Sequence, residues 1–105
     1  MEKAHIFQFI KEIDYTPDGI VSKQIIKHKT GNVTLFAFDT GQVLSEHTAP
    51  FDALLQVIEG QAEITIDKQQ YPLKEGDSII LPANIPHAVK ALKAFKMVLT
   101  MIREV

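Results

Sequence analysis

Short runs of alternating apolar and polar residues dominate the chain from residue 20 onward, and turn-forming residues separate them. In the clearest run, Ala62, Ile64 and Ile66 share one face and polar residues occupy the other. A period of two is typical of a β-strand with one buried face. The same reasoning predicts nine strands, at residues 20–27, 33–38, 42–48, 53–58, 62–66, 71–73, 78–81, 86–91 and 94–102. No long stretch has a helical period, so we expect an all-β sandwich or barrel.

The last predicted strand is apolar on both faces. Its odd-numbered positions from Phe95 to Met101 form one face, and Val98 and Ile102 lie on the other. A strand that is apolar on both faces is buried on both faces. We therefore expect the second face to meet another copy of the chain in a two-fold homodimer. The alternative is that the N-terminal segment of the same chain covers this face.

Residues 1–19 are the least regular part of the chain. We interpret them as an N-terminal segment that packs on the barrel or on a partner subunit. The sequence YTPDG at residues 15–19 predicts a turn. Residues 6–13 fit either an opening strand or a short helix, since periodicity alone does not separate the two. Residues 20–105 are expected to form a single barrel.

Composition narrows the class of protein further. A chain of 105 residues has room for one hydrophobic core. A formal net charge of −2 provides no broad basic surface for nucleic acid. The lack of cysteine excludes disulfides, thiolate metal sites and a cysteine nucleophile, and it suits a reducing compartment. No apolar run approaches the roughly 20 residues that span a bilayer, and the first residues lack a signal-peptide layout. We expect a cytoplasmic protein that binds neither nucleic acid nor membranes.

Two histidines occur in runs with the same arrangement of turn residues. The first run contains Gly41, His47 and Gly60, and the second contains Gly76, Pro82 and His87. In order and spacing these runs resemble the paired motifs of the cupin superfamily, G-x5-H-x-H-x3,4-E-x6-G and G-x5-P-x-G-x2-H-x3-N. The resemblance covers about residues 33–102 and implies a cupin barrel, a small jelly roll or double-stranded β-helix.

The chain departs from these motifs at four positions. Ala49 and Ala53 replace the second histidine and the glutamate of the first motif, and Asn84 and Ala91 replace a glycine and the asparagine of the second. Asparagine tolerates a left-handed backbone better than most residues, so we expect the turn at residue 84 to survive. In metal-binding cupins the motif histidines and glutamate converge on one divalent ion. The resemblance therefore implies that His47 and His87 are the retained ligands.

Two imidazoles fall short of the three protein ligands that are usual at a catalytic metal ion. Candidates for a third ligand are Gln56, Met97 and Asp52, which also fit roles as a surface amide, a core methionine and a turn residue. Any metal (Mn, Fe, Ni, Cu or Zn) is therefore expected to be held weakly or to be absent. Without metal, apolar surroundings favour neutral imidazoles, which can act as general bases or contact a ligand.

The interior of the barrel is expected to be apolar. Depending on strand parity, the candidate lining residues are Phe36, Phe38, Leu55, Val57, Met97 and Leu99, which would serve equally as an ordinary core. An apolar cavity with two polar groups is typical of a small-molecule site. The favoured hypothesis is a small-molecule-binding cupin with a depleted metal site. A metal-dependent oxygenase or isomerase and a structural homodimer are the alternatives, so the sequence assigns no enzymatic activity.

Overall fold

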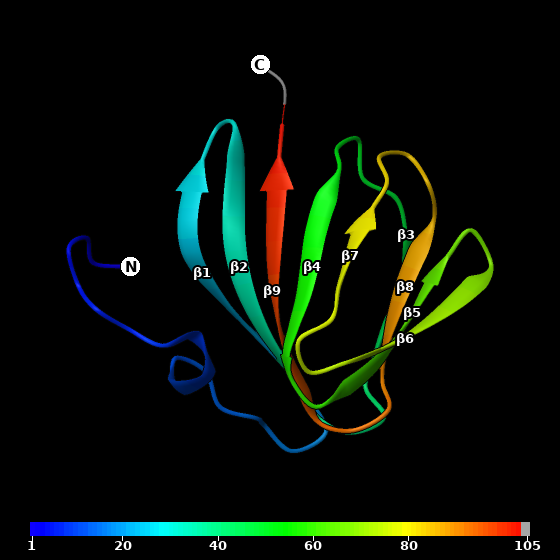
Figure 1. Ribbon diagram of the computed structural model, residues 1–105, viewed down its shortest axis with the longest axis horizontal. Coiled ribbons are helices and arrows are strands. Elements are labelled where there is room, and N and C mark those ends of the chain that lie inside the picture. The colour runs from blue at the N-terminus through cyan, green and yellow to red at the C-terminus, as the bar shows by residue number, and fades with distance from the viewer. Residues whose placement is uncertain (104–105) are drawn as a thin grey trace.

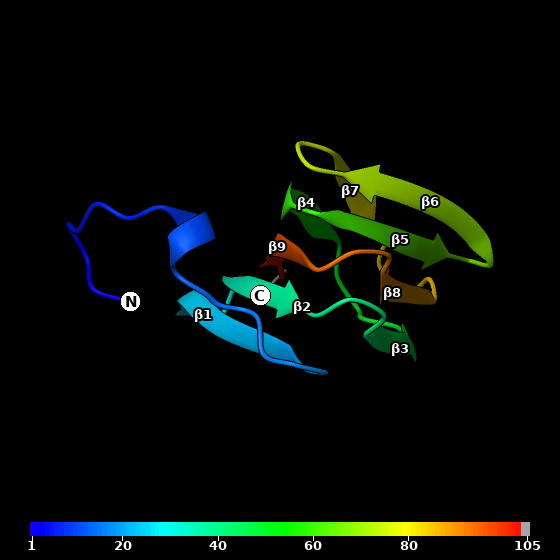
Figure 2. The same ribbon diagram turned by 90° about the horizontal axis from the view of Figure 1, so that it is seen from below.

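Two antiparallel β-sheets pack against each other and form a jelly-roll barrel (Figures 1 and 2). The computed structural model describes residues 1–103 of the chain. The larger sheet has the strand order β1-β2-β9-β4-β7, and the smaller sheet has the order β3-β8-β5-β6. The strands are β1 (Ile20–His28), β2 (Gly31–Phe38), β3 (Val43–His47), β4 (Ala53–Glu59), β5 (Gln61–Ile66), β6 (Gln69–Lys74), β7 (Ser78–Leu81), β8 (His87–Ala91) and β9 (Phe95–Ile102).

All nine strands predicted from the sequence are confirmed, and their ends lie within two residues of the predicted ends. Residues 6–13, which fitted a strand or a short helix, contain one turn of 3-10 helix, η1 (Phe9–Lys11). Ala62 and Ile64 are both 0% exposed, as the alternation of β5 predicted. Among the described residues, no helix is long and apolar enough to cross a membrane.

The main core lies between the two sheets. It consists of the inward-facing residues of strands from both sheets. They include Leu55 and Val57 on β4, Ile64 on β5 and Val89 on β8. Each of these four side chains is at most 2% exposed. The opposite positions on β4 and β8 are more exposed, so burial alternates along these strands. This alternation fixes which side chains of these strands face the interior, and it places His87 on the inward face of β8.

A second cluster lies on the outer face of the larger sheet. Val98 is 4% exposed and packs there in a cluster with Leu35 from β2 and Ile13 from the N-terminal segment. Figure 2 shows this segment on the side of the larger sheet that is remote from the smaller one. The chain therefore covers Val98 itself, which was the alternative to burial by a second copy. Ile102, further along the same face, remains 72% exposed.

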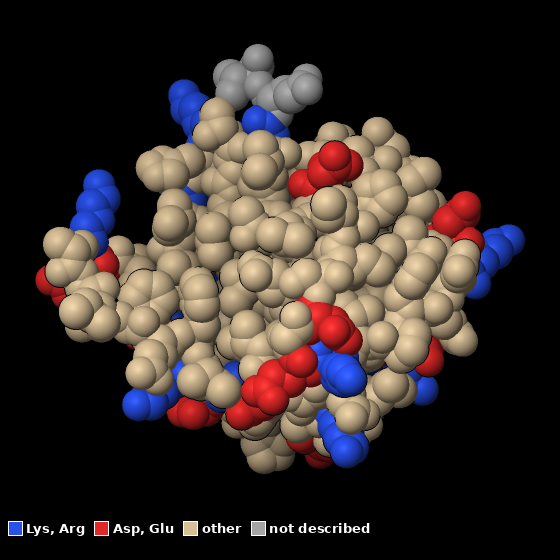
Figure 3. All heavy atoms as spheres, viewed as in Figure 1, with Lys and Arg blue, Asp and Glu red and all other residues tan. Residues whose placement is uncertain are grey.

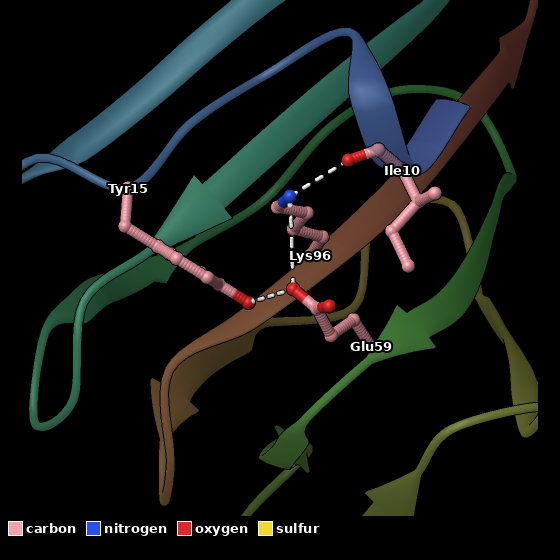
Figure 4. A network of polar contacts seen from close by, with 4 residues as sticks. All are labelled: Ile10, Tyr15, Glu59 and Lys96. Carbon is pink, nitrogen blue, oxygen red and sulfur yellow. Dashed lines mark hydrogen bonds and ion pairs between the residues drawn. The ribbon is translucent and has the colours of Figure 1, made fainter. Parts of the chain in front are cut away.

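A small polar network fastens the N-terminal segment to the barrel (Figure 4). The Tyr15 hydroxyl donates to Glu59 Oε2 at 2.5 Å, and Lys96 Nζ lies 3.6 Å from the same oxygen. Lys96 is 7% exposed and also donates to the backbone oxygen of Ile10 at 2.8 Å. Burial of the phenol and its hydrogen bond to Glu59 raise the pKa of Tyr15, so the hydroxyl stays protonated and remains a donor.

Candidate functional site

His47 and His87 face each other from neighbouring strands of the smaller sheet. In the β3–β8 pairing, His47 stands opposite His87, and Leu44 stands opposite Val89. Val89 is 2% exposed and belongs to the main core, so this side of β8 faces the barrel interior. His87 lies two residues before Val89 and therefore shares its inward face.

A β-bulge brings His47 to this face. Leu44 and His47 are three positions apart on β3, whereas their partners Val89 and His87 are only two positions apart on β8. In a regular strand an odd separation would place Leu44 and His47 on opposite faces. The extra residue in the Ser45–Glu46 stretch returns the His47 side chain to the same face as Leu44. Bulges beside functional sites often redirect a side chain in this way. No feature of the sequence indicates this bulge, which is visible only from the register of β3 with β8.

The two imidazoles meet through their Nε2 atoms, which lie 3.1 Å apart. The ring centroids are 4.3 Å apart and the ring planes are inclined by 69°. On the other side of each ring, Nδ1 lies within hydrogen-bond distance of a backbone oxygen, at 2.8 Å from Ser45 and 3.2 Å from Ile85. A carbonyl oxygen only accepts, so both Nδ1 atoms must carry the proton. When both rings are neutral with Nδ1 protonated, the two Nε2 lone pairs face each other, and a proton on either Nε2 makes the 3.1 Å contact a hydrogen bond.

The surroundings of the two rings differ. His87 is 6% exposed, whereas His47 is open to solvent at the end of β3. Burial lowers the pKa of His87, the hydrogen bond to Ile85 partly opposes this shift, and the charge of His47 adds to it. His87 is thus held as a neutral imidazole with an available lone pair. The conflict between the two lone pairs is relieved when a proton or a metal ion lies between them.

Backbone contacts connect the loops that precede and follow these strands. The amide of Asn84 donates to the oxygen of Ala49 at 2.7 Å, and the amide of Ala83 donates to Asp52 Oδ1 at 2.8 Å. Asn84 has a φ of 62°, so the predicted left-handed turn is present. These contacts hold the loop after His47 against the loop before His87 and so support the position of both rings.

The structure gives the three residues considered as a third metal ligand other contacts or positions. Asp52 is used by the hydrogen bond from Ala83, and Gln56 is exposed on the outward face of β4. Met97 is 1% exposed in the main core, where it pairs with Phe36 and Val57. Within residues 1–103, no group of three His, Cys, Asp or Glu side chains could hold a metal ion. The described chain therefore offers a divalent metal two nitrogen ligands and no carboxylate.

The six candidate lining residues all belong to the interior. Four of them are at most 1% exposed in the main core: Phe38, Leu55, Val57 and Met97. Phe36 and Leu99 are partly buried against the same cluster. Phe38 also stacks on Phe95, with centroids 4.6 Å apart. The four buried residues are part of the hydrophobic core, whereas Phe36 and Leu99 keep some solvent-accessible surface.

Comparison with known proteins identifies the family. A family model described as a cupin domain matches residues 34–103. The chain belongs to the cupin family. A conserved protein of unknown function from Streptococcus pyogenes, SPY1581, is 34% identical, with a TM-score of 0.94 over 100% of this chain and 92% of that chain. A cupin 2 conserved barrel domain protein from Leptotrichia buccalis is 36% identical, with a TM-score of 0.90 over 92% of this cupin and 47% of that chain.

A mannose-6-phosphate isomerase from Streptococcus mutans shares a shorter segment. It is 44% identical over 46 residues, which are 44% of this cupin and 14% of that isomerase. This cupin therefore spans only a small part of the length of that relative. The shared segment is similar in sequence, and the activity of the whole isomerase does not follow from it.

Proposed function

We propose that this cupin binds a small molecule at the His47–His87 pair, together with a weakly held divalent transition metal. The observation that supports this is the approach of the two Nε2 atoms to 3.1 Å while both Nδ1 atoms are engaged by backbone oxygens. Neutral imidazoles in this arrangement have no hydrogen to share, and a cation between them removes the conflict.

The separation of the two nitrogens suits adjacent ligands of one ion. With metal–nitrogen bonds of about 2.0–2.1 Å, two ligands would lie about 2.9 Å apart at a right angle and about 3.4 Å apart at a tetrahedral angle. The observed 3.1 Å falls between these values. The backbone oxygens of Ser45 and Ile85 fix the tautomer and orientation of each ring, as the outer partners of metal-binding histidines commonly do.

Weak binding follows from the number of ligands. Alanine at positions 49 and 53 supplies no donor atom, so water or a bound small molecule would complete the coordination of Mn, Fe, Ni, Cu or Zn. A bound ion would act as a Lewis acid toward that molecule. The protein itself would orient the ligand between the two rings, and the partly accessible Phe36 and Leu99 would provide apolar contacts.

A metal-dependent isomerase is the second candidate. The neutral, buried His87 has a lone pair that could accept a proton from a bound substrate, and His47 is open to exchange it with solvent. The segment similar to mannose-6-phosphate isomerase favours isomerisation over oxygenation. The substrate would then be a small organic molecule whose reacting carbon bears an acidic hydrogen.

Calorimetric titration with Mn²⁺, Ni²⁺ and Zn²⁺ tests the proposal. We expect His47→Ala and His87→Ala each to weaken binding by at least an order of magnitude, because each removes one of two ligands. His28→Ala is the matched control, since His28 is exposed at the end of β1. Binding by both variants that equals that of the unmodified protein would disprove the site.

A ligand screen separates binding from catalysis. With metal present, the correct small molecule should raise the melting temperature by mass action, and this gain should disappear in both histidine variants. Turnover of a sugar phosphate or a related hydroxycarbonyl compound, lost in the same variants, would support the isomerase. Stabilisation without turnover would support the binding protein.

A further inference from the structure

The inward face of the larger sheet changes from apolar to polar along β2. Phe38 is 0% exposed in the main core, and Phe36 is partly buried against it. The next two positions on this face, toward the start of the strand, are Thr34 and Asn32, because successive side chains on one face are two residues apart. Thr34 pairs with Leu99, which packs on the main core, so the register also places Thr34 on the inward face. The inward face of β2 therefore ends in two polar side chains.

These two side chains lie at the end of the barrel that also holds the histidine pair. Asn32 pairs with Met101, and Met101 pairs with Ala53 at the start of β4. The chain enters β4 through the loop that follows His47 at the end of β3. In Figure 1 the β1–β2 hairpin, the end of β9 and the β3–β4 loop all lie at the upper end of the barrel. We call this end, which holds His47 and His87, the mouth.

Polar and apolar side chains at the mouth occupy different halves of the larger sheet. From β2 the two inward rows continue through apolar residues on β9, β4 and β7: Met101, Ala53 and Leu81 beside Asn32, and Leu99, Leu55 and Ile79 beside Thr34. The two sheets run in the same order in Figure 2, with β3 and β8 toward the β2 side and β6 toward the β7 side. The polar half of the larger sheet therefore lies across from the strands that carry the two histidines.

Asn32 and Thr34 form one polar unit. The Thr34 hydroxyl donates to Asn32 Oδ1 at 3.2 Å. This bond orients the amide and leaves the N–H donors of its Nδ2 group, together with the lone pairs of the Thr34 oxygen, to other partners. Both residues are half-buried, so a bound molecule can reach these groups. A ligand group that both donates and accepts hydrogen bonds suits this unit better than a group that only accepts.

The charges around the mouth favour a neutral ligand. Among the described residues of the two inward rows, only Lys27 is charged, and it is exposed on the edge strand β1. Arg103, beyond the end of β9, lies over the ring of Phe51. On the face seen in Figure 3, Lys and Arg are interspersed with Asp and Glu, so no patch of one sign would attract an ion. Carboxylates and phosphates are bound most strongly by charged donors, whereas an amide and a hydroxyl match ligand hydroxyl groups.

We propose that Asn32 and Thr34 form a second contact for the ligand of the histidine pair, and that this ligand is a neutral polyhydroxylated compound. The inference rests on the proposed function, since it adds the opposite wall of the same site. One end of the ligand meets the histidine pair or a metal ion held there, and adjacent hydroxyl groups at the other end bond to Asn32 and Thr34. The partly accessible Phe36 and Leu99 contact its carbon skeleton.

Nuclear magnetic resonance of the isotope-labelled full chain tests this inference, because the side-chain amide of Asn32 gives its own signals. The probes are erythritol, which is uncharged and carries a hydroxyl on every carbon, and succinate, which has the same number of carbons and two carboxylates. With Zn²⁺ present, we expect erythritol to shift the Asn32 side-chain signals saturably and succinate to leave them unchanged. Thr34→Val and Asn32→Asp, followed by the backbone signals of β2, should each weaken erythritol binding roughly fivefold, because each removes a hydrogen bond.

Thr100→Val is the matched control, since Thr100 is also half-buried but pairs with Leu54 on the outer face of the same sheet. It should bind erythritol as the unmodified protein does. Asn32 signals that do not respond to erythritol, or that respond more to succinate, would overturn the inference, and so would equal affinities of Thr34→Val and Thr100→Val. A separate Zn²⁺ titration distinguishes the two proposals. Loss of metal binding counts against the histidine pair, whereas bound metal without a response at Asn32 counts against this inference alone.

Discussion

At the scale of single residues, this cupin combines two retained histidines with two alanines at ligand positions. The sequence singled out both histidines through the cupin motifs, and the structure brings their Nε2 atoms to 3.1 Å. It could not predict the backbone partners at Ser45 and Ile85, because carbonyl groups are common to all residues. Those partners favour the tautomers with the proton on Nδ1, in which the two Nε2 lone pairs of neutral rings converge.

Restoring the missing ligands should restore a tight metal site. In the double variant Ala49→His/Ala53→Glu, two further donors would join His47 and His87, and we expect Zn²⁺ or Mn²⁺ affinity to rise by at least an order of magnitude. Because Ala53 is 6% exposed, the new carboxylate should destabilise the metal-free protein, and metal should restore its melting temperature. Unchanged affinity would show that positions 49 and 53 do not face the histidine pair.

The pKa of His87 predicts how stability depends on pH in metal-free protein. Burial lowers this pKa below the ordinary value of 6.5. The stability contributed by the neutral ring is therefore fully present above pH 6.5 and is lost as the pH falls toward the folded-state value, since the unfolded chain takes up the proton first. The slope is at most about 1.4 kcal/mol per pH unit.

Urea unfolding between pH 5 and pH 7.5, with a chelator present, measures this effect. His87→Gln should flatten the acid side of the profile because it removes the titrating group, whereas His28→Gln should leave the profile unchanged. If the profile of His87→Gln matched that of the unmodified protein, His87 would not be the group responsible.

At the scale of elements, alternation and turn residues were sufficient to predict nine strands to within two residues. They were insufficient to predict strand order, because β2 pairs with β9 and β4 pairs with both β7 and β9 across long sequence separations. They also missed the bulge before His47, whose extra residue is visible only once the register with β8 is known. Local sequence determines local structure here, and the site depends on pairing between distant segments.

The turn between β4 and β5 illustrates a glycine that is required for two reasons. Gly60 has a φ of 80°, and a Cβ there would lie 2.0 Å from the backbone oxygen of Ala94. Gly76 has a φ of 92°, but nothing lies within 4 Å of its Cβ position. We expect Gly76→Ala to cost about 1–2 kcal/mol of unfolding free energy from backbone strain alone.

Gly60→Ala should cost clearly more, since β5 or the start of β9 must also move to relieve the contact. Chemical unfolding of the two variants side by side measures the difference. Equal losses would mean that the backbone near Ala94 yields without cost, and that the close contact at Gly60 does not require glycine.

At the scale of the whole molecule, the N-terminal segment was the least predictable part. Because β9 is apolar on both faces, the sequence indicated that Val98 is buried. It could not show whether residues 1–19 or a second copy of the chain bury this side chain. The structure uses Ile13 for this purpose and anchors the segment through Tyr15, Glu59 and Lys96. Ile102, further along the same face of β9, stays 72% exposed in the single chain.

The proposed function of the whole molecule rests on the histidine pair of the smaller sheet. The fold is established by the family match and by the agreement with solved cupin structures. Function depends on what the two lone pairs hold. The most direct measurement is therefore anomalous scattering from crystals grown with Zn²⁺ or Mn²⁺.

We predict one anomalous peak at about 2.0–2.2 Å from Nε2 of both His47 and His87, with non-protein density at the remaining coordination positions. A peak bound to only one of the two rings, or no peak near either of them at saturating metal, would contradict the account.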